Sequence, residues 1–152
     1  MVTKVDEIIK SEGNAITSAD NEFTVEAGYI CTLDVDGNLD DFILAQRAAN
    51  GGTTTRNVGD NVLRITHFIT APGVRSRTGE FCIDVRLICE DGTVYFTQSS
   101  GIAKSVKNIV RMCINKKTGE YISPLERGIG FKIVETELDN GNTYKYLDPV
   151  RL

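Results

Sequence analysis

The chain has 152 residues, 41% of them hydrophobic, with 17 basic and 21 acidic side chains and a formal net charge of −4. This length suits one domain with a substantial core and is too short for two independent ones. No segment approaches the roughly 20 apolar residues of a membrane span, and no apolar stretch follows a basic start. We therefore expect a cytoplasmic protein with no membrane partner.

The charge is distributed unevenly along the chain. Residues 1–41 hold two lysines against ten acids, a net charge of −8, whereas residues 42–152 hold 15 basic residues against 11 acids, a net charge of +4. Basic clusters of this kind are typical of a polyanion site, although they are also ordinary solvated surface. The sequence therefore predicts an acidic N-terminal extension, residues 1–41, before a basic domain, residues 42–152.

The cysteines and the acidic run give no support to a metal site. The four cysteines have neither the paired CxxC spacing of a zinc site nor the density of a disulfide scaffold, so we expect buried, reduced thiols at Cys31, Cys82, Cys89 and Cys113. The run Asp34–Asp41 does not match an EF-hand loop, because its glycine is fourth instead of sixth. No metal ion and no other cofactor is expected.

The first part of the chain predicts few regular elements. The first 22 residues suggest a short helix and a loose connector. Phe23–Leu33 is interpreted as an extended segment, and a turn at Asp36-Gly37 or Gly37-Asn38 returns the chain into Asp41–Ala49. The glycine-rich stretch Asn50–Thr55 predicts a mobile loop, and it lacks the GK[ST] ending of a phosphate-binding P-loop.

Val62–Thr70 predicts a strand with one face toward the core and the other toward water. The core set is Leu63, Ile65, His67 and Ile69, and the outer set is Arg64, Thr66, Phe68 and Thr70. Phe68 would then be exposed beside Arg64, which is an unfavourable position unless something stacks on its ring. We therefore treat Phe68 as a candidate stacking residue.

Two β-rich runs flank Asp91–Gly92, a dipeptide that favours a two-residue type I′ turn. That turn would place Leu87 opposite Phe96 on the core face of the hairpin. It would place Arg86 and Tyr95 on the outer face. This hairpin is therefore expected to present one cation and one aromatic ring to solvent.

The rest of the chain predicts a helix and two more strands. Ser99 is suited to cap a helix whose apolar spacing runs to Cys113, with a basic far side at Lys104, Lys107 and Arg111 that is more often a solvated face than a phosphate contact. Ile129–Glu137 and Thr143–Leu147 alternate as strands joined by a turn. From Val62 onward the order β-β-β-α-β-β predicts a mainly β protein with the five-stranded Greek-key barrel of the oligonucleotide/oligosaccharide-binding (OB) fold.

The residues give little support to an enzyme. His67 is the one histidine and is predicted to face the core, and the sequence has no GxSxG, no HExxH and no Cys/His set with ligand spacing. We therefore expect no catalytic residues and a binding protein instead of an enzyme.

The predicted outer face has the two features that bind single-stranded nucleic acid, namely cations along the phosphates and aromatic rings on which bases stack. Six residues from the first three strands and their loop form this candidate site: Arg64, Phe68, Arg75, Arg77, Arg86 and Tyr95. In the alternative interpretation, Tyr95 packs beneath the acidic segment and the arginines only keep the surface soluble. The convergence of six residues on one strip favours the nucleic-acid site.

Several short motifs between about Phe42 and Leu147 recur in a familiar order and spacing. They are Ala45-Gln46 before Gly51-Gly52, the long first strand through Thr66, Asp91-Gly92-Thr93-Val94-Tyr95, Ser99–Lys104 and Phe131-Lys132-Ile133. In this order the chain resembles the small single-stranded-DNA-binding proteins of tailed phages, especially those serving protein-primed replication. The resemblance implies a cytoplasmic protein of an infected host cell that coats and protects displaced strands during phage DNA replication, cooperatively and without a cofactor.

Three alternatives stay open. The partner implied by the resemblance is single-stranded DNA, and single-stranded RNA is the alternative. The resemblance also implies that copies of the protein associate with one another along the strand. The rival function is a phage interaction or structural protein that uses the same barrel to dock a protein partner. Residues 1–41 would either screen the basic face in competition with DNA or contact a neighbouring subunit.

Overall fold

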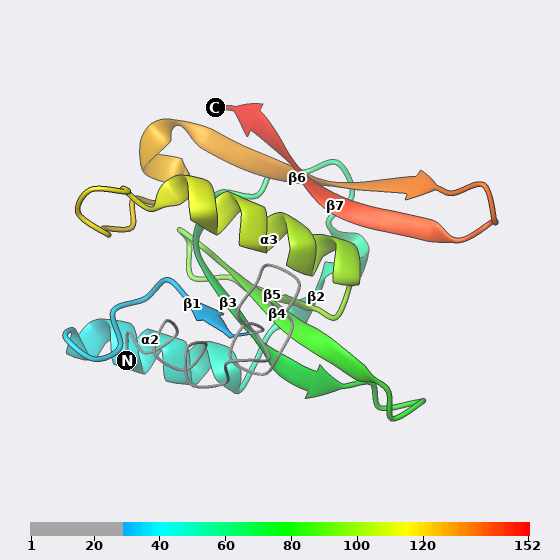
Figure 1. The fold of residues 1–152 in the computed structure, drawn as a ribbon, viewed down its shortest axis with the longest axis horizontal. Coiled ribbons are helices and arrows are strands. Elements are labelled where there is room, and N and C mark those ends of the chain that lie inside the picture. Colours follow the sequence, from blue (N-terminus) through cyan, green and yellow to red (C-terminus); the bar gives the residue numbers. More distant parts are fainter. Residues whose placement is uncertain (1–28) are drawn as a thin grey trace.

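The computed structural model describes residues 29–152, which form a mainly β fold (Figure 1). The strands are β1 (Ile30–Cys31), β2 (Thr53–Thr54), β3 (Ile65–Val74), β4 (Phe81–Cys89), β5 (Val94–Thr97), β6 (Ile129–Glu137) and β7 (Thr143–Arg151). The helices are α2 (Leu39–Ala49) and α3 (Ser100–Cys113), with short 3-10 turns η2 (Thr55–Asn57) and η3 (Leu125–Arg127). The predicted mainly β class is confirmed, and so is the order of three strands, helix and two strands from β3 onward. The elements predicted for the first 22 residues lie outside the described residues.

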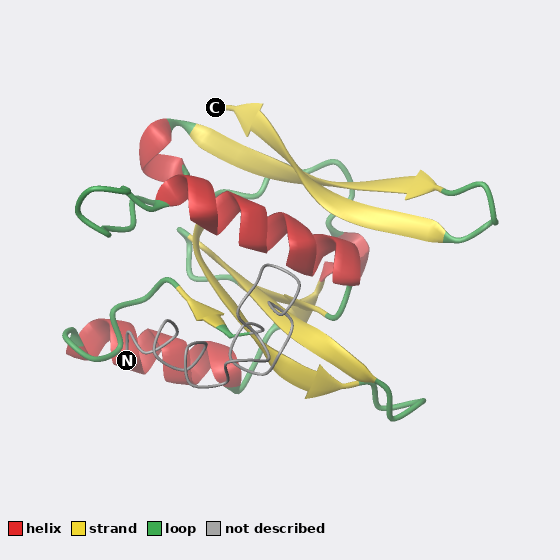
Figure 2. Cartoon of the chain, viewed as in Figure 1, coloured by secondary structure: helices red, strands yellow, loops and turns green. Residues whose placement is uncertain are grey.

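The elements are stacked in layers (Figure 2). The larger sheet has the strand order β1-β3-β4-β5-β2, and β6 and β7 form a separate antiparallel hairpin. Helix α3 packs against β7 and also against β3 and β4, so it lies between the two sheets, whereas α2 packs on the opposite face of the larger sheet. None of the described helices is long and apolar enough to cross a membrane.

The two sheets are joined along one side and open along the other. Leu63 and Phe131 form an antiparallel bridge, with Leu63 N donating to Phe131 O at 2.7 Å and Phe131 N donating to Leu63 O at 3.0 Å. On the other side β5 pairs with the short parallel strand β2, and within residues 29–152 no ladder connects β5 to β6 or β7. The larger sheet is therefore open, and the closed five-stranded barrel expected from the sequence is not what the structure has.

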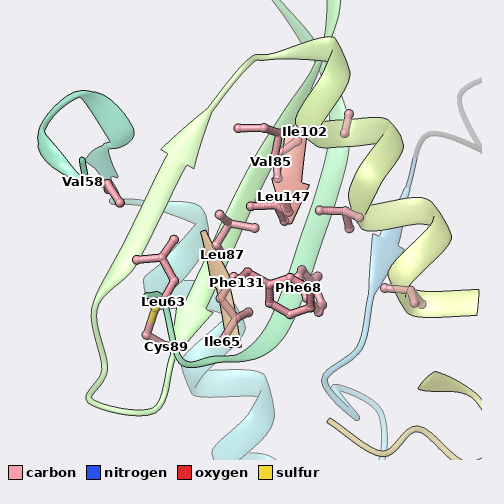
Figure 3. Packing of buried hydrophobic residues seen from close by; sticks show 13 residues of the cluster. Val58, Leu63, Ile65, Phe68, Val85, Leu87, Cys89, Ile102, Phe131 and Leu147 are labelled. Atoms are coloured by element: carbon pink, nitrogen blue, oxygen red, sulfur yellow. The ribbon is translucent and has the colours of Figure 1, made fainter. Parts of the chain in front are cut away.

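The main core lies between the two sheets and under α3. Its buried members come from both sheets, from α3 and from the segment before β3: Val58, Leu63, Ile65, Phe68, Val85, Leu87, Cys89, Ile102, Ala103, Val106, Val110, Phe131 and Leu147. The rings of Phe68 and Phe131 meet edge to face with centroids 6.4 Å apart (Figure 3). This contact joins the two sheets through side chains next to the point where the Leu63 bridge joins them through the backbone.

A β-bulge in β3 overturns the predicted faces of that strand. The pairing with β4 shifts between Ile65, which faces Cys89, and His67, which faces Ile88, so Thr66 is the extra residue. An extra residue reverses the alternation of every side chain after it. Phe68 is therefore fully buried in the core, while His67 and Ile69 face the other side of the sheet, and the prediction of an exposed Phe68 is wrong.

Side chains around the bulge satisfy its polar groups. Thr66 Oγ1 donates to Ile88 O at 3.2 Å, and Tyr121 Oη donates to Thr66 O at 2.7 Å. The ring of Tyr121 lies 5.5 Å from that of His67, and His67 Nδ1 is hydrogen-bonded to Thr32 Oγ1 at 3.0 Å. The connector before β6 and the segment after β1 thus hold the bulge from the outer side.

The turn between β4 and β5 also differs from the prediction. Gly92 N donates to Cys89 O at 3.0 Å and Cys89 N donates to Thr93 O at 2.9 Å, so the loop has three residues, not two. Only Gly92 has positive φ (92°), whereas a type I′ turn would also require positive φ at Asp91. The register therefore moves by one residue, Leu87 faces Tyr95, and the predicted pairing of Leu87 with Phe96 is wrong.

The segment before β3 belongs to the fold more closely than predicted. Asp41–Ala49 lies in helix α2, whose N-cap Asn38 accepts a hydrogen bond from Asp41 N at 3.0 Å. The inner face of α2, around Ala48, packs in a second core cluster with Leu33, Ile69 and Ile88. The boundary expected between residues 41 and 42 therefore falls inside a helix that covers the larger sheet.

Helix α3 follows the predicted pattern closely. Ser99 caps it by accepting a hydrogen bond from Ile102 N at 3.2 Å, and the predicted core residues Ile102, Ala103, Val106, Val110 and Cys113 are buried. Gly101 lies against the backbone of β7, where an added Cβ would overlap the carbonyl oxygen of Lys145. Ser105 Oγ accepts a hydrogen bond from Leu147 N at 3.1 Å, so the helix and β7 are in contact over two turns.

We expect Gly101→Ala to destabilise the protein by about 1–3 kcal/mol, because the new methyl group would push α3 away from β7. Helix propensity alone gives the opposite sign, since Ala is favoured over Gly by about 1 kcal/mol. Urea unfolding followed by circular dichroism measures the difference. Asn108→Ala on the exposed side of the same helix is the control and should be neutral or slightly stabilising. A Gly101→Ala protein as stable as the parent would show that the contact is loose.

We also expect acid to weaken the fold through His67. Burial lowers the pKa of His67 below its usual 6.5, despite the opposing effect of Asp41 and Glu126. The unfolded chain therefore takes up a proton first as the pH falls, and the stability present above pH 6.5 is lost below it. The free energy of unfolding should drop as the pH falls below 6.5, and His67→Gln should flatten that drop. An equal drop in both proteins would assign it to other groups.

Candidate nucleic-acid interface

The six residues predicted to bind nucleic acid do not form one strip. Phe68 is in the core and offers no ring to a ligand. Tyr95 lies on the core-facing side of β5, where it packs against the main cluster. Arg64 forms a salt bridge with Glu90 just beyond the end of the β3–β4 ladder. The structure therefore removes Phe68 from the site and gives Tyr95 and Arg64 neighbours that were not expected.

Arg64 and Tyr95 meet at a small pocket of about 160 Å³ at the β4–β5 turn. Glu90 and Asp91 also line this pocket. The hydrogen bonds that Asp91 accepts from Thr93 lower the pKa of its carboxyl group, which keeps it charged. Two carboxylates beside one paired arginine oppose the binding of a phosphate, so this pocket is a poor nucleic-acid site.

The outer face of β4 and β5 has a different aromatic residue from the one predicted. Arg86 faces outward as expected, and its guanidinium carbon lies 4.7 Å from the centroid of the Phe96 ring. Arg86 Nε also donates to Gly51 O at 3.1 Å, which holds the guanidinium at the glycine-rich loop. Gly52 has φ 134°, and an added Cβ would lie 2.7 Å from the Phe96 Cβ, so only glycine fits beside the ring.

A polar network continues this face toward the β3–β4 loop. Gln98 Nε2 donates to Asp84 Oδ1 at 2.8 Å, and Arg75 donates to Gln98 O at 3.2 Å. Asp84 has room for its carboxylate because Gly73, on the neighbouring strand, has no side chain. Arg75 is thus fixed at the end of β5 as a half-buried cation, close to the outer side of the sheet.

Arg77 lies apart from this network. It is exposed in the loop between β3 and β4, and no described residue forms a hydrogen bond or ion pair with its side chain. The loop projects from the body of the fold at the end of the β3–β4 hairpin (Figure 1). Of the six predicted residues, Arg75 and Arg86 therefore border β5 on its outer side, Arg64 and Tyr95 meet at the turn pocket, and Phe68 and Arg77 lie apart from both pairs.

A second, larger cleft lies where the two sheets fail to close, and we call it the seam cleft. It has a volume of about 510 Å³ and is lined by Thr54, Thr55, Arg56, Val58, Gly59, Phe96, Thr97, Gln98, Ile133, Glu135 and Lys145. Arg56 enters from η2 and Lys145 from β7, and one acid, Glu135, faces Lys145 across the β6–β7 ladder. Phe96 and Gln98 border both this cleft and the outer face, so the two surfaces meet along β5.

Four residues of this arrangement were missed from the sequence: Arg56, Phe96, Gln98 and Lys145. Phe96 was placed in the core because the type I′ turn shifts the register by one residue. A three-residue turn with Gly92 in the left-handed region would have paired Phe96 with Arg86 directly. Arg56 and Lys145 come together only through the open seam, which no local pattern indicates.

The described residues contain no group of three or more His, Cys, Asp or Glu side chains that could hold a metal ion. All four cysteines are free thiols, three of them buried as predicted and Cys31 partly buried. Burial raises the pKa of Cys89 to about 11, so this thiol stays protonated and unreactive at neutral pH. The chemistry available in the seam cleft is that of two cations, one carboxylate, hydroxyl and amide groups and one aromatic ring.

Comparisons with known proteins add no family to this description. No family model matches the chain, and no curated protein and no solved structure is significantly similar to it. The resemblance to phage single-stranded-DNA-binding proteins therefore stays a prediction from the sequence motifs.

Proposed function

We propose that the protein binds single-stranded DNA, without sequence preference, along β5 and in the seam cleft. The observation that carries the proposal is the half-buried Phe96 ring, which Arg86 covers at 4.7 Å beside an open cleft with two further cations. Aromatic rings beside cations bind single strands, because each base has a face to stack and each nucleotide has a phosphate to neutralise. Sequence tolerance follows, since neither contact reads the edge of a base.

The seam cleft favours a single strand over a duplex. A base can stack on Phe96 only when it is unpaired, because a duplex buries the faces of its bases. The cleft volume of about 510 Å³ lies within the roughly 300–1,000 Å³ of ordinary ligand pockets, which accommodates a small group such as a nucleotide. Arg75 and Arg86 would follow the backbone on the outer side, and Arg56 and Lys145 would follow it within the cleft.

The fold supports this proposal as an opened form of the OB arrangement. The order of strands and helix from β3 onward is that of an OB fold, and the Leu63–Phe131 bridge joins its first and fourth strands. In a closed OB barrel the third strand would pair with the last, whereas here β2 occupies part of that edge of β5. The proposed ligand site is the gap that this leaves.

The biological setting is a separate proposal. Coating of displaced strands during phage DNA replication, in the cytoplasm of an infected cell, rests on the motif resemblance alone. The absence of catalysis and of a cofactor likewise stays a prediction. The binding activity can be tested without reference to either.

We expect salt to weaken binding through the two cleft cations. Anisotropy of a labelled oligothymidine and of its duplex counterpart, measured over a salt series, should show tighter binding of the single strand and a steep loss of affinity. Replacing Arg56 and Lys145 by Gln should reduce the slope of log K against log salt by about 1.4, at about 0.7 per lost phosphate contact.

The matched control for the cleft cations is a pair of exposed lysines in the connector after α3. Lys116→Gln with Lys117→Gln removes the same charge from a loop that does not line the cleft. The slope should then keep its original value. Equal slopes in the two double variants would mean that the cleft cations act only through the net charge of the protein. If the protein does not bind single strands at low salt, the proposed function is refuted.

We expect the Phe96 ring to contribute through stacking. Phe96→Leu should weaken oligothymidine binding by about 1–3 kcal/mol, or about 5- to 150-fold, whereas Phe96→Tyr should retain most of the affinity. Tyr95→Phe, on the core-facing side of the same strand, is the control and should bind like the parent. Circular dichroism and thermal unfolding would establish that each variant is folded. An unchanged affinity in folded Phe96→Leu would place the DNA elsewhere.

A further inference from the structure

Two exposed apolar patches of opposite charge lie outside the proposed DNA site. The first, the α2 patch, consists of Leu39, Phe42 and Ile43 with Asp40 beside them. The second, the arm patch, consists of Val74 and Phe81 with Arg77 beside them, at the end of the β3–β4 hairpin. Leu39 is 73% exposed, Val74 61% and Phe81 58%. Exposed apolar clusters of this kind are typical of protein contact surfaces.

The α2 patch is the outward face of an amphipathic helix. Its three apolar residues are spaced i, i+3 and i+4, so they lie side by side, opposite the face that packs against the larger sheet through Ala48. The surroundings of its first turn are acidic, because residues 34–41 contain four aspartates, whereas the one basic residue of the helix, Arg47, lies in the last turn. Asp40 is exposed in the first turn of the helix.

The arm patch is its electrostatic complement. Val74 and Phe81 face each other directly across the β3–β4 ladder, so they form one apolar surface at the end of the hairpin. Residues 74–81 contain two arginines and one glutamate. Arg77 lies at the loop between the two strands and is exposed to solvent.

The two patches lie at opposite ends of the molecule. Figure 1, viewed down the shortest axis of the protein, shows the start of α2 at one end and the tip of the β3–β4 hairpin at the other. The distance between them means that one chain cannot cover its own arm patch with its own α2 patch. The α2 patch can therefore be covered by an arm patch only when that arm patch belongs to a second molecule.

We propose that the α2 patch of one copy binds the arm patch of the next copy. Apolar residues meet on each side, and the acidic surroundings of α2 face Arg77 of the neighbouring arm. Because the two surfaces differ and lie at opposite ends, the contact is heterologous and generates an open chain of molecules, not a closed dimer. The patches are small, so the contact belongs to the weak, concentration-dependent class.

This self-association is a property of the protein alone and does not rest on DNA binding. Sedimentation velocity of the full chain without nucleic acid should show a weight-average mass that rises with concentration past that of two copies. Higher salt should weaken the association, because exposed charges are screened. A protein that stays monomeric at all accessible concentrations would overturn the proposal, whatever the outcome of the DNA experiments.

Charge reversal tests which surfaces meet. Arg77→Glu and Asp40→Lys, each alone, should raise the concentration needed for association by about tenfold or more. The chain that carries both reversals should associate like the parent, and so should an equimolar mixture of the two single variants. Lys116→Glu, which makes the same change in net charge as Arg77→Glu, is the control and should have no effect. Failure of the double reversal to restore association would refute the pairing of these two patches.

The apolar part is tested in the same way. Phe81→Ser should weaken association by about tenfold, whereas Leu138→Ser, at another exposed apolar residue beside the β6–β7 turn, should not. Both side chains are exposed, so both variants should fold, and thermal unfolding would verify this. Equal effects of the two substitutions would indicate nonspecific hydrophobic association and would contradict the assigned interface.

Discussion

The backbone bridge between Leu63 and Phe131 is the constraint on which the arrangement of the two sheets depends. Among the described residues it is the one place where backbone hydrogen bonds join the larger sheet to the β6–β7 hairpin. The core forms beside it, where Phe68 meets Phe131 and α3 fills the space between the sheets. Because the sheets are joined on that side only, the opposite side stays open and becomes the seam cleft.

The elements were largely predictable from the sequence, but the direction of their side chains was not. The Ser99 cap and the apolar residues at helical spacing predict helix α3, and both features appear in the structure. Successive side chains of a strand point to opposite faces of the sheet, so one added residue exchanges the faces of all the residues that follow it. The bulge at Thr66 places Phe68 in the core. The three-residue turn ending at Gly92 places Tyr95 on the core-facing side of β5 and Phe96 on the outer face.

The candidate site was predictable only in part, because it depends on long-range packing. Arg75 and Arg86 were identified from strand and loop positions that the structure keeps, whereas Arg56 and Lys145 become neighbours through the open seam. The net charge does not indicate the candidate site either, since residues 29–152 carry 15 basic and 15 acidic side chains. What distinguishes the seam cleft is that it holds two cations and one acid beside an aromatic ring, while the smaller pocket pairs Arg64 with two acids.

The two-residue strand β2, at one edge of the larger sheet, has a mechanical consequence for the seam cleft. Strand β2 contains only Thr53 and Thr54, both exposed, and it pairs with β5 alone. Residues with few buried contacts detach at a small fraction of the global unfolding free energy. The β2 side is therefore the most compliant wall of the seam cleft. The width of the opening can adapt to a bulky ligand while the hydrophobic core behind it keeps its shape.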